Sequence, residues 1–400
     1  MLDLTRLAQQ MQGMSQQLTI EAAATRHRLE RAQTVLNQVR QHQEQLVQLH
    51  QTWGDRLCFT AAQPLEPLNQ PVPVSGQVAA HTVLATDGSQ IAPSHHEIAY
   101  CYLINIGRIA LHYGQSRFPL LDSLPEVFYQ PDDLYGARQW GIRTEEWMSY
   151  RRTVSEATVL AELAEAIGQG ELATDTATRS PYLAMVDGSL IYWFLETLPG
   201  EARDRILSPI LQAWDRLRAA QVPLVGYLSA SRSGEALNFF RLQLCPYEAP
   251  DCQRHCASPS DRSPCQVLDP LKDTALWANL LQPGERSPLW RSSASILNFY
   301  REHRVYFCYL HVGSEIARIE FPAWVAADAR QFDQILSQVL TQVQKGYGYP
   351  IALAEAHNLA VVRGSDRARF FALLEQHLIR AGLQNVGTSY KEARKRGSIA

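Results

Sequence analysis

The chain has 400 residues, which is enough for two or three domains and for a large hydrophobic core. Hydrophobic residues make up 46% of it and charged residues 19%, and a net charge of −3 excludes a chain that is basic throughout, so any nucleic-acid surface must be local. Its start lacks the apolar segment of a signal peptide and no apolar run approaches the length of a membrane span, so we expect a cytoplasmic protein without membrane contact.

The first predicted element is a helical arm over residues 1–62. Apolar residues recur three or four positions apart from Leu4 to Leu46, with one slip of phase near Ala22, which predicts a long helix that pairs with another helix. Twelve glutamines among the first 51 residues favour exposed outer faces, as in a helical hairpin or a coiled coil. The proline-rich residues 63–80 predict an extended linker between this arm and the body.

The body, predicted over residues 81–375, begins with strands and continues with helices and strands. Three strands are expected first, over 81–87, 98–106 and 108–114, with a break at Gly107. A helix is expected over residues 144–167, where apolar residues recur at helical spacing. The later expected elements are strands over 182–187 and 222–230, a helix over 233–245, a hairpin around Gly313, helices over 325–346, 350–362 and 367–379, and a helix end with a basic tail over 376–400.

The tripeptide DGS occurs twice, each time after an apolar strand. Asp87 and Asp187 therefore both stand at strand ends, where a side chain is held rigidly and the next glycine allows a sharp turn and the approach of an ion or phosphate. Hydrolysis of a phosphodiester needs an activated water and neutralisation of the leaving oxygen, and two Mg²⁺ or Mn²⁺ ions bound by carboxylates about 3.5–4 Å apart can supply both. Asp-Gly is also a common turn dipeptide, so the residues alone leave two plain turns open as the alternative.

The order of the expected elements favours one fold class. Three strands, an acidic helix, a strand that ends on a second aspartate, and a late helix with a polar residue in an apolar setting are the order of ribonuclease H-like nucleases. We therefore predict an α/β fold, with a ribonuclease H-like mixed β-sheet core flanked by helices and a long N-terminal helical arm.

Four segments together resemble the NurA nuclease family: the first DGS with its strand, AMVDGSLIYW (184–193), DPLKDTALWANLLQPGERSPLW (269–290) and GYPIALAEAHNLAVV (348–362). The resemblance covers roughly residues 80–370. It implies a manganese-dependent nuclease with a ribonuclease H-like core, which degrades DNA from 5′ ends, cuts single strands, forms dimers and works with a hexameric HerA-type ATPase in DNA end resection. It also implies that Asp87 and Asp187 bind metal, that His357 is a late ligand or acid/base group, and that Tyr349 lies nearby.

The family pattern also includes a glutamate on the helix between the two aspartates. The sequence offers five candidates there, and we expect Glu156 to fill the role because it stands beside Val154, Ala157 and Leu160 and is thus close to a buried face. A solvated helix surface is the expectation for the other four, which are Glu145, Glu146, Glu162 and Glu165.

His357 and Tyr349 also have plain structural interpretations. A histidine on an apolar helix face is often a packed core residue, and a tyrosine before a proline usually packs against its neighbours. Beside a metal and a phosphate, the imidazole could instead transfer a proton at neutral pH or bind Mn²⁺ through nitrogen.

Four cysteines lie in a polar, proline-rich insertion over residues 245–265. The insertion has too few apolar residues to pack by itself, and Cys245, Cys252, Cys256 and Cys265 could hold Zn²⁺ or an iron–sulfur cluster that orders it. The gaps of six, three and eight residues match no standard metal motif, so ordinary reduced cysteines are the alternative.

Arginines and aromatic residues alternate just before and within the expected helix over 144–167. Guanidinium groups on phosphates and rings on bases would suit single-stranded DNA, and a helix with a solvated basic side is the alternative. The residues expected to bind nucleic acid are Arg138, Trp140, Arg143, Arg151 and Arg152.

The sequence thus predicts a Mn²⁺- or Mg²⁺-dependent two-metal DNA nuclease that acts on single-stranded or resected DNA as a homodimer. It carries no GxxxxGK[ST] loop, so an ATP-driven motor would have to be a partner. The alternatives are a NurA-like adaptor with a decayed site, which binds DNA or an ATPase without cutting, and a metal phosphoesterase for small molecules. Few histidines near either aspartate disfavour the latter, although His95 and His96 follow the first DGS.

Overall fold

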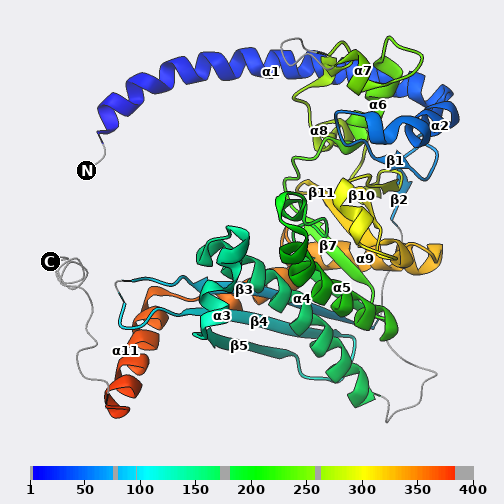
Figure 1. Ribbon diagram of the computed structural model, residues 1–400. Helices are drawn as coiled ribbons and strands as arrows, with labels where there is room; N and C mark the ends of the chain where they lie inside the picture. Colours follow the sequence, from blue (N-terminus) through cyan, green and yellow to red (C-terminus); the bar gives the residue numbers. More distant parts are fainter. Residues whose placement is uncertain (1–2, 75–79, 96, 172–180, 257–262, 383–400) are drawn as a thin grey trace. The chain divides into compact units, whose positions relative to one another are not determined.

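The computed structural model describes residues 3–74, 80–95, 97–171, 181–256 and 263–382 (Figure 1). Contacts divide the chain into two units built from interleaved segments. Unit 1 holds Met1–Ser75, Gly188–Ile191 and Tyr227–Ala326, and unit 2 holds Gly76–Asp187, Tyr192–Gly226 and Ala327–Ala400. The predicted bounds of the arm, linker and body stay predictions, and the basic tail lies outside the described residues.

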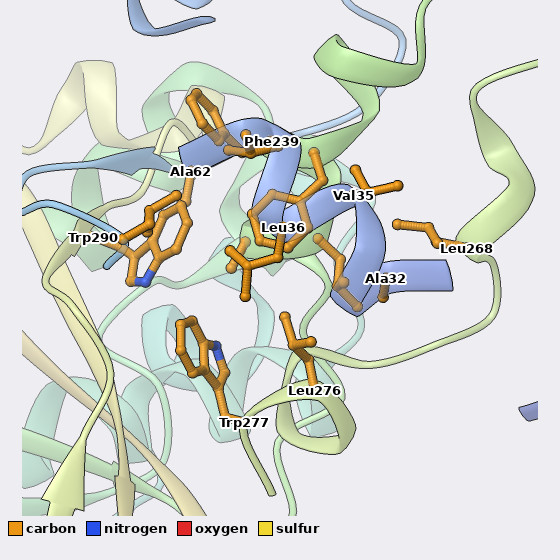
Figure 2. Close-up of a cluster of buried hydrophobic side chains, with 14 of the residues drawn as sticks. Ala32, Val35, Leu36, Ala62, Phe239, Leu268, Leu276, Trp277 and Trp290 are labelled. Carbon is orange, nitrogen blue, oxygen red and sulfur yellow. The ribbon is translucent and has the colours of Figure 1, made fainter. Parts of the chain in front are cut away.

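Unit 1 begins with the predicted long helix, which is confirmed as α1 (Leu4–Gln41) and followed by α2 (Gln43–Trp53). Apolar residues are exposed in its first half, and from Ala32 onward they are buried. Figure 2 shows Leu36 of α1 among Phe239, Trp277 and Trp290, which belong to one buried cluster. The second half of α1 therefore belongs to the hydrophobic core of unit 1.

The other elements of unit 1 are short helices and one antiparallel hairpin with short strands beside it. The hairpin predicted around Gly313 is confirmed as β10 (Val305–His311) and β11 (Ile316–Pro322), and Gly313 has a positive φ of 98°. The helix predicted over 233–245 is α6 (Glu235–Leu244). The remaining elements are α7 (Cys252–His255), α8 (Asp273–Ala278), β1 (Gln63–Pro64), β2 (Val72–Pro73), β8 (Glu285–Arg286) and β9 (Trp290–Arg291).

Unit 2 is built on a mixed sheet, in which the strand order is β7-β6-β3-β4-β5. The strands are β3 (His81–Ile91), β4 (Tyr102–Tyr113), β5 (Leu120–Phe128), β6 (Tyr182–Asp187) and β7 (Leu224–Leu228), whose last two residues belong to unit 1. The first three run antiparallel, and β6 returns parallel to β3 after the long helix α4 (Thr144–Glu171). The predicted α/β fold with a ribonuclease H-like mixed sheet is confirmed.

Helices line this sheet. Beside α4 and α5 (Gly200–Ala219), which Figure 1 shows over the strands, unit 2 contains α3 (Pro131–Tyr135), α9 (Ala329–Lys345), α10 (Ile351–Ala360) and α11 (Gly364–Arg380). The last three correspond to the three helices predicted after Pro322, whereas α5 had no counterpart in the prediction. No helix among the described residues is long and apolar enough to cross a bilayer.

The predicted break at Gly107 is wrong, because β4 runs through it without interruption. Gly107 pairs with Asp87 across the ladder, and the third strand is β5, later in the chain. A Cβ atom on Gly107 would collide with the backbone of Ala356 and Ala360 in α10. The glycine is therefore present to let a helix lie directly on the sheet, and turn formation has no part in it.

Two helices cover opposite faces of β3. Thr86 donates its hydroxyl hydrogen bond to the carbonyl of Glu156 in α4 at 3.0 Å, whereas Ser89 donates to the carbonyl of Ala360 in α10 at 2.5 Å. Asn105 of β4 also donates to the Ala360 carbonyl, at 2.8 Å. Because successive side chains of a strand point to opposite faces, Asp87 faces α10 and its neighbours face α4.

We expect Gly107→Ala to lower the free energy of unfolding by about 1–3 kcal/mol, the usual effect of overpacking. The added methyl group would meet backbone atoms of α10, which cannot rotate away as a side chain can. Gly136→Ala is the control, because nothing lies within 4 Å of its Cβ position and its φ is −56°. Thermal or urea unfolding measures both; equal stability of the two variants would contradict the packing role of Gly107.

Candidate active site

The two DGS aspartates stand next to each other on parallel strands. Thr86 of β3 is paired with Val186 of β6, and Asp87 and Asp187 are the residues that follow each of them. The carboxyl ends of parallel strands meet at one edge of a sheet, so both side chains leave the sheet at the same level. The juxtaposition expected from the sequence is therefore present.

The two tripeptides nevertheless differ in their local structure. Gly188 has a φ of 115° and turns the chain at the end of β6, as expected for an Asp-Gly turn. Gly88 stays in the ladder opposite Ile106, and β3 continues to Ile91. The explanation of both glycines as sharp turns holds for the second tripeptide and is wrong for the first.

Gly88 makes room for an acidic side chain. A Cβ atom at this position would lie 2.5 Å from Oε1 of Glu156 and 2.7 Å from Cγ of Arg152. Backbone amides along a strand point alternately to its two neighbours. The amide of Thr82 donates toward β6, so the amide of Gly88, six residues later, points to the same side of β3. At that level β6 has already ended. There the Gly88 amide donates to the carboxylate of Glu156.

Glu156 is thus the glutamate of α4 that lies beside Asp87 and Asp187. Its side chain is 18% exposed, and Oε1 is 3.3 Å from Nε of Arg152 one turn earlier. The pKa of Glu156 is raised to about 8, chiefly because burial disfavours the charged form. The negative charges of Asp87 and Asp187 raise the same pKa, and only Arg152 and the Gly88 amide oppose them.

The other four candidate glutamates of this helix are engaged or placed elsewhere. Glu146 accepts a hydrogen bond from the hydroxyl of Tyr150 at 2.6 Å, and Glu165 forms a bidentate ion pair with Arg216. Glu145 lines a separate cavity near the start of α4, and Glu162 is exposed one turn before Glu165 and Ala166. Among the five, Glu156 is the one whose charge interacts with both aspartates.

His357 and Tyr349 complete this group from the α10 side. Nδ1 of His357 lies 2.7 Å from Oδ2 of Asp87, while the imidazole is 64% exposed and the carboxylate 22% exposed. The hydroxyl of Tyr349 hydrogen-bonds to Asp187. Partial burial and the charge of Asp87 raise the pKa of Asp187, whereas Tyr349 and His357 lower it. All five side chains belong to unit 2.

The residues that position α10 had no signal in the sequence. Ser89 and Asn105 both bind the carbonyl of Ala360, three residues beyond His357. They are polar residues within apolar strands, and their partner is about 255–271 positions away. By contrast, the pairing of Arg152 with Glu156 is an ordinary four-residue spacing on a helix, and binding of nucleic acid by Arg152 stays a prediction.

Comparison with known proteins adds to this geometry. A family model described as the NurA domain matches residues 81–362. The chain belongs to the NurA domain family. Two solved structures match this chain, each with 10% sequence identity. The NurA nuclease from Sulfolobus solfataricus has a TM-score of 0.48 over 87% of this chain and 98% of that chain.

The second is a structure of LC9-RNase H1, a type 1 RNase H with the type 2 active-site motif, whose TM-score is 0.21 over 42% of this chain and 72% of that chain. No curated protein matches this chain. The NurA family model spans β3 to the end of α10 and so includes Asp87, Glu156 and Asp187, which we call the acidic group, together with Tyr349 and His357. Family membership supports a nuclease, and therefore a hydrolase.

The donor set of this NurA domain fits a hard divalent cation. Burial is the largest cause of the raised pKa of Glu156, and repulsion from Asp87 and Asp187 raises that pKa further. Carboxylate oxygens are the ligands that Mg²⁺ and Mn²⁺ prefer. In the described part of the chain, no three His, Cys, Asp or Glu side chains are already arranged as a metal cluster. A bound ion would therefore have to draw the carboxylates together.

The cysteine-rich insertion lies within the NurA domain range. Cys245, Cys252, Cys256 and Cys265 line one cavity of about 10 Å³, together with Arg241. This volume holds about one water-sized sphere, and an iron–sulfur cluster at these thiols stays a prediction. Cys58 lies outside the family match, and its thiol hydrogen-bonds to Cys252. All seven cysteines are free, and a Zn²⁺ ion at these thiols stays a prediction.

The residues expected to bind nucleic acid have different surroundings. Arg138 and Arg143 line an open cavity of about 420 Å³ in unit 2. Trp140 donates to Glu201 at 3.2 Å, Arg151 lies 3.6 Å from Asp133, and Arg152 is held by Glu156. A larger cavity of about 650 Å³ lies in unit 1 and includes no member of the acidic group.

Proposed function

We propose that this chain is a metal-dependent DNA nuclease, which cuts single-stranded DNA and degrades strands from their 5′ ends with Mn²⁺ or Mg²⁺. The observation that carries the proposal is that Asp87 and Asp187 follow paired residues of β3 and β6, and that Glu156 of α4 interacts electrostatically with both. They are acidic residues whose charges interact beside a histidine and a tyrosine, inside a NurA domain. A site with this composition is suited to hydrolysis of a phosphodiester.

In this proposal, the three carboxylates would hold two metal ions. The ions would polarise the phosphodiester and lower the pKa of the attacking water. Arg152 would keep Glu156 in place, since its Nε is 3.3 Å from Oε1. The paired backbones of β3 and β6 would hold Asp87, within β3, and Asp187, at the end of β6, in fixed positions.

His357 would handle a proton at the same site. Its Nδ1 faces Asp87 at 2.7 Å, which leaves Nε2 directed away from that contact. An imidazole held in this way by a carboxylate can accept or donate a proton at Nε2 near neutral pH. Its 64% exposure would let the substrate phosphate reach it. Tyr349, which hydrogen-bonds to Asp187, would keep that carboxylate oriented.

We also propose that the nuclease acts with a HerA-like hexameric ATPase in resection of DNA ends, and that it forms a homodimer. Membership of the NurA domain family supports the ATPase partnership. Such a partner would supply the movement along DNA, because the sequence carries no ATP-binding loop of the GxxxxGK[ST] type.

The experiment is degradation of a 5′-labelled single strand by the purified full chain, with Mn²⁺, with Mg²⁺ and after chelation. We expect cutting with Mn²⁺, no cutting after chelation and full recovery when Mn²⁺ is added back. The size of the first labelled products gives the polarity, since 5′ attack releases label as short products at once. If the chain binds the strand but never cuts it with either ion, it is a non-catalytic adaptor and the nuclease proposal is wrong.

A further inference from the structure

We propose that the cavity near the start of α4 binds an unpaired nucleobase with its phosphate, and that it thereby sets the shortest single strand that the nuclease binds well. The inference rests on the proposed function and concerns the part of the strand away from the carboxylates. The cavity has a volume of about 420 Å³, which lies within the range of small-ligand sites. The polar and aromatic side chains that line it belong to His95, Tyr100, Arg138, Arg143, Thr144 and Glu145.

Flat side chains form a parallel row at this cavity. The ring of His95 stacks on Tyr100 with centroids 4.3 Å apart and planes 11° apart. Tyr100 is 6.0 Å from Tyr135 with planes 4° apart, and the guanidinium of Arg138 lies 4.5 Å over Tyr135. His95 ends the row and is exposed, so a base could extend the stack there. The base must be unpaired to present its face.

Two arginines at the cavity are available for phosphate. Arg138 and Arg143 are exposed, and neither forms an ion pair with a described residue. Their neighbours Arg151 and Arg152 differ, because each lies within 4 Å of a carboxylate. Guanidinium groups without an acidic partner can bind a phosphate without first giving up an internal ion pair.

The floor of the cavity is rigid. The hydroxyl of Thr144 is buried and donates to the carbonyl of Leu134 at 2.7 Å, which ties the start of α4 to α3. Trp147 is buried one turn later and packs against Trp140 with ring centroids 5.6 Å apart. Binding therefore requires little ordering of the protein, which keeps the entropic cost of holding a strand small.

Helix α4 also fixes the distance between the cavity and the acidic group. Thr144 and Glu156 belong to the same helix, and twelve residues at 1.5 Å each span about 18 Å. A stacked strand advances about 3.4 Å per nucleotide, so this distance corresponds to roughly five nucleotides. A strand of about five nucleotides or more could reach both places, and a shorter one could reach the carboxylates alone.

The test is a length series of 5′-labelled oligothymidylates, from about three to about twenty nucleotides, cut by the full chain with Mn²⁺. We expect KM to fall sharply once the strand reaches about five nucleotides. His95→Ala with Arg143→Ala should raise KM for the long strands roughly tenfold and leave kcat and the shortest strands unchanged. Glu145→Gln, which removes a negative charge from the cavity lining, should lower KM. Arg369→Ala on α11 is the matched control for Arg143→Ala and should leave KM unchanged.

A single abasic nucleotide locates the contact. The abasic nucleotide is placed at successive positions of a long strand. In the wild type, it should raise KM most when it is about the fifth nucleotide from the cut. In His95→Ala, it should raise KM at no position. The same KM for the double variant and the wild type, or an equal increase at every length, would overturn the inference. If the wild type cuts nothing, the nuclease proposal fails, and fluorescence anisotropy with labelled oligothymidylate still decides whether His95 and Arg143 bind the strand.

Discussion

Asp187→Asn should reduce the rate of metal-dependent strand cutting by about a thousandfold or more and leave the fold intact. The neutral amide removes one charged oxygen from a site in which Asp87, Glu156 and Asp187 interact electrostatically, and several kcal/mol of transition-state stabilisation correspond to such a factor. Asparagine has nearly the same shape and can still accept the hydrogen bond from Tyr349. We expect the same loss for Asp87→Asn, which also removes the charged partner of His357.

Three measurements distinguish a loss of catalysis from a loss of metal binding or of folding. They are initial rates at saturating Mn²⁺, Mn²⁺ affinity by calorimetry, and thermal unfolding. Asp204→Asn is the matched control, because this aspartate is 64% exposed on α5 and, among the described residues, forms an ion pair only with its neighbour Arg203 at 3.2 Å. Cutting by both Asp87→Asn and Asp187→Asn at wild-type rate would show that the acidic group does not perform the reaction.

Glu156→Gln should abolish most cutting and, at the same time, stabilise the metal-free protein at pH 8. The pKa of Glu156 in the folded chain is about 8, above its ordinary value of 4.5, so the ionised carboxylate costs the folded state free energy. That cost is absent below pH 4.5, grows as the pH rises and is complete above about 8. Glutamine carries no charge, and we expect a gain in unfolding free energy on the order of 1–2 kcal/mol at pH 8 and almost none near pH 4.5.

The same ionisation governs metal binding. A cation must displace the proton of Glu156, so the Mn²⁺ affinity of the wild type should increase with pH up to about 8 and then level off. In Glu156→Gln this part of the pH dependence should vanish. Glu162→Gln, at an exposed position of the same helix, is the control and should alter neither stability nor the pH profile. A lower melting temperature for Glu156→Gln at pH 8 would contradict the assigned burial cost.

Local patterns in the sequence predicted much of unit 2. The strand over 182–187 and the helix from Thr144 were predicted with their observed starts, because an apolar run bounded by polar residues and a 3.6-residue period are both local signals. Glu156 was selected for the same reason, as its apolar neighbours place it near the buried face of α4. The position of both aspartates on strands also follows from local patterns, since each comes after an apolar run, although only Asp187 ends its strand and β3 continues beyond Asp87.

Other features depend on contacts between distant segments and leave no local pattern. Gly107 looked like a break, whereas it is the place where α10 lies on β4. The role of Gly88 becomes visible only when Glu156 is placed beside it. One segment of unit 1, Gly188–Ile191, has only four residues and lies between two segments of unit 2, so no shift of composition marks its boundaries. Such features are decided by packing, which sequence periodicity does not describe.

The pairing of Asp87 with His357 also has a consequence for protein synthesis, because the two residues are 270 positions apart. At about 5–20 residues per second, a ribosome adds the histidine roughly 15–50 s after the aspartate. Until α10 has left the ribosome and docked on its sheet face, a nascent chain presents the acidic edge without its imidazole. Premature termination upstream of α10 would then release products that hold the three carboxylates but lack the imidazole to which we assign a proton-handling role.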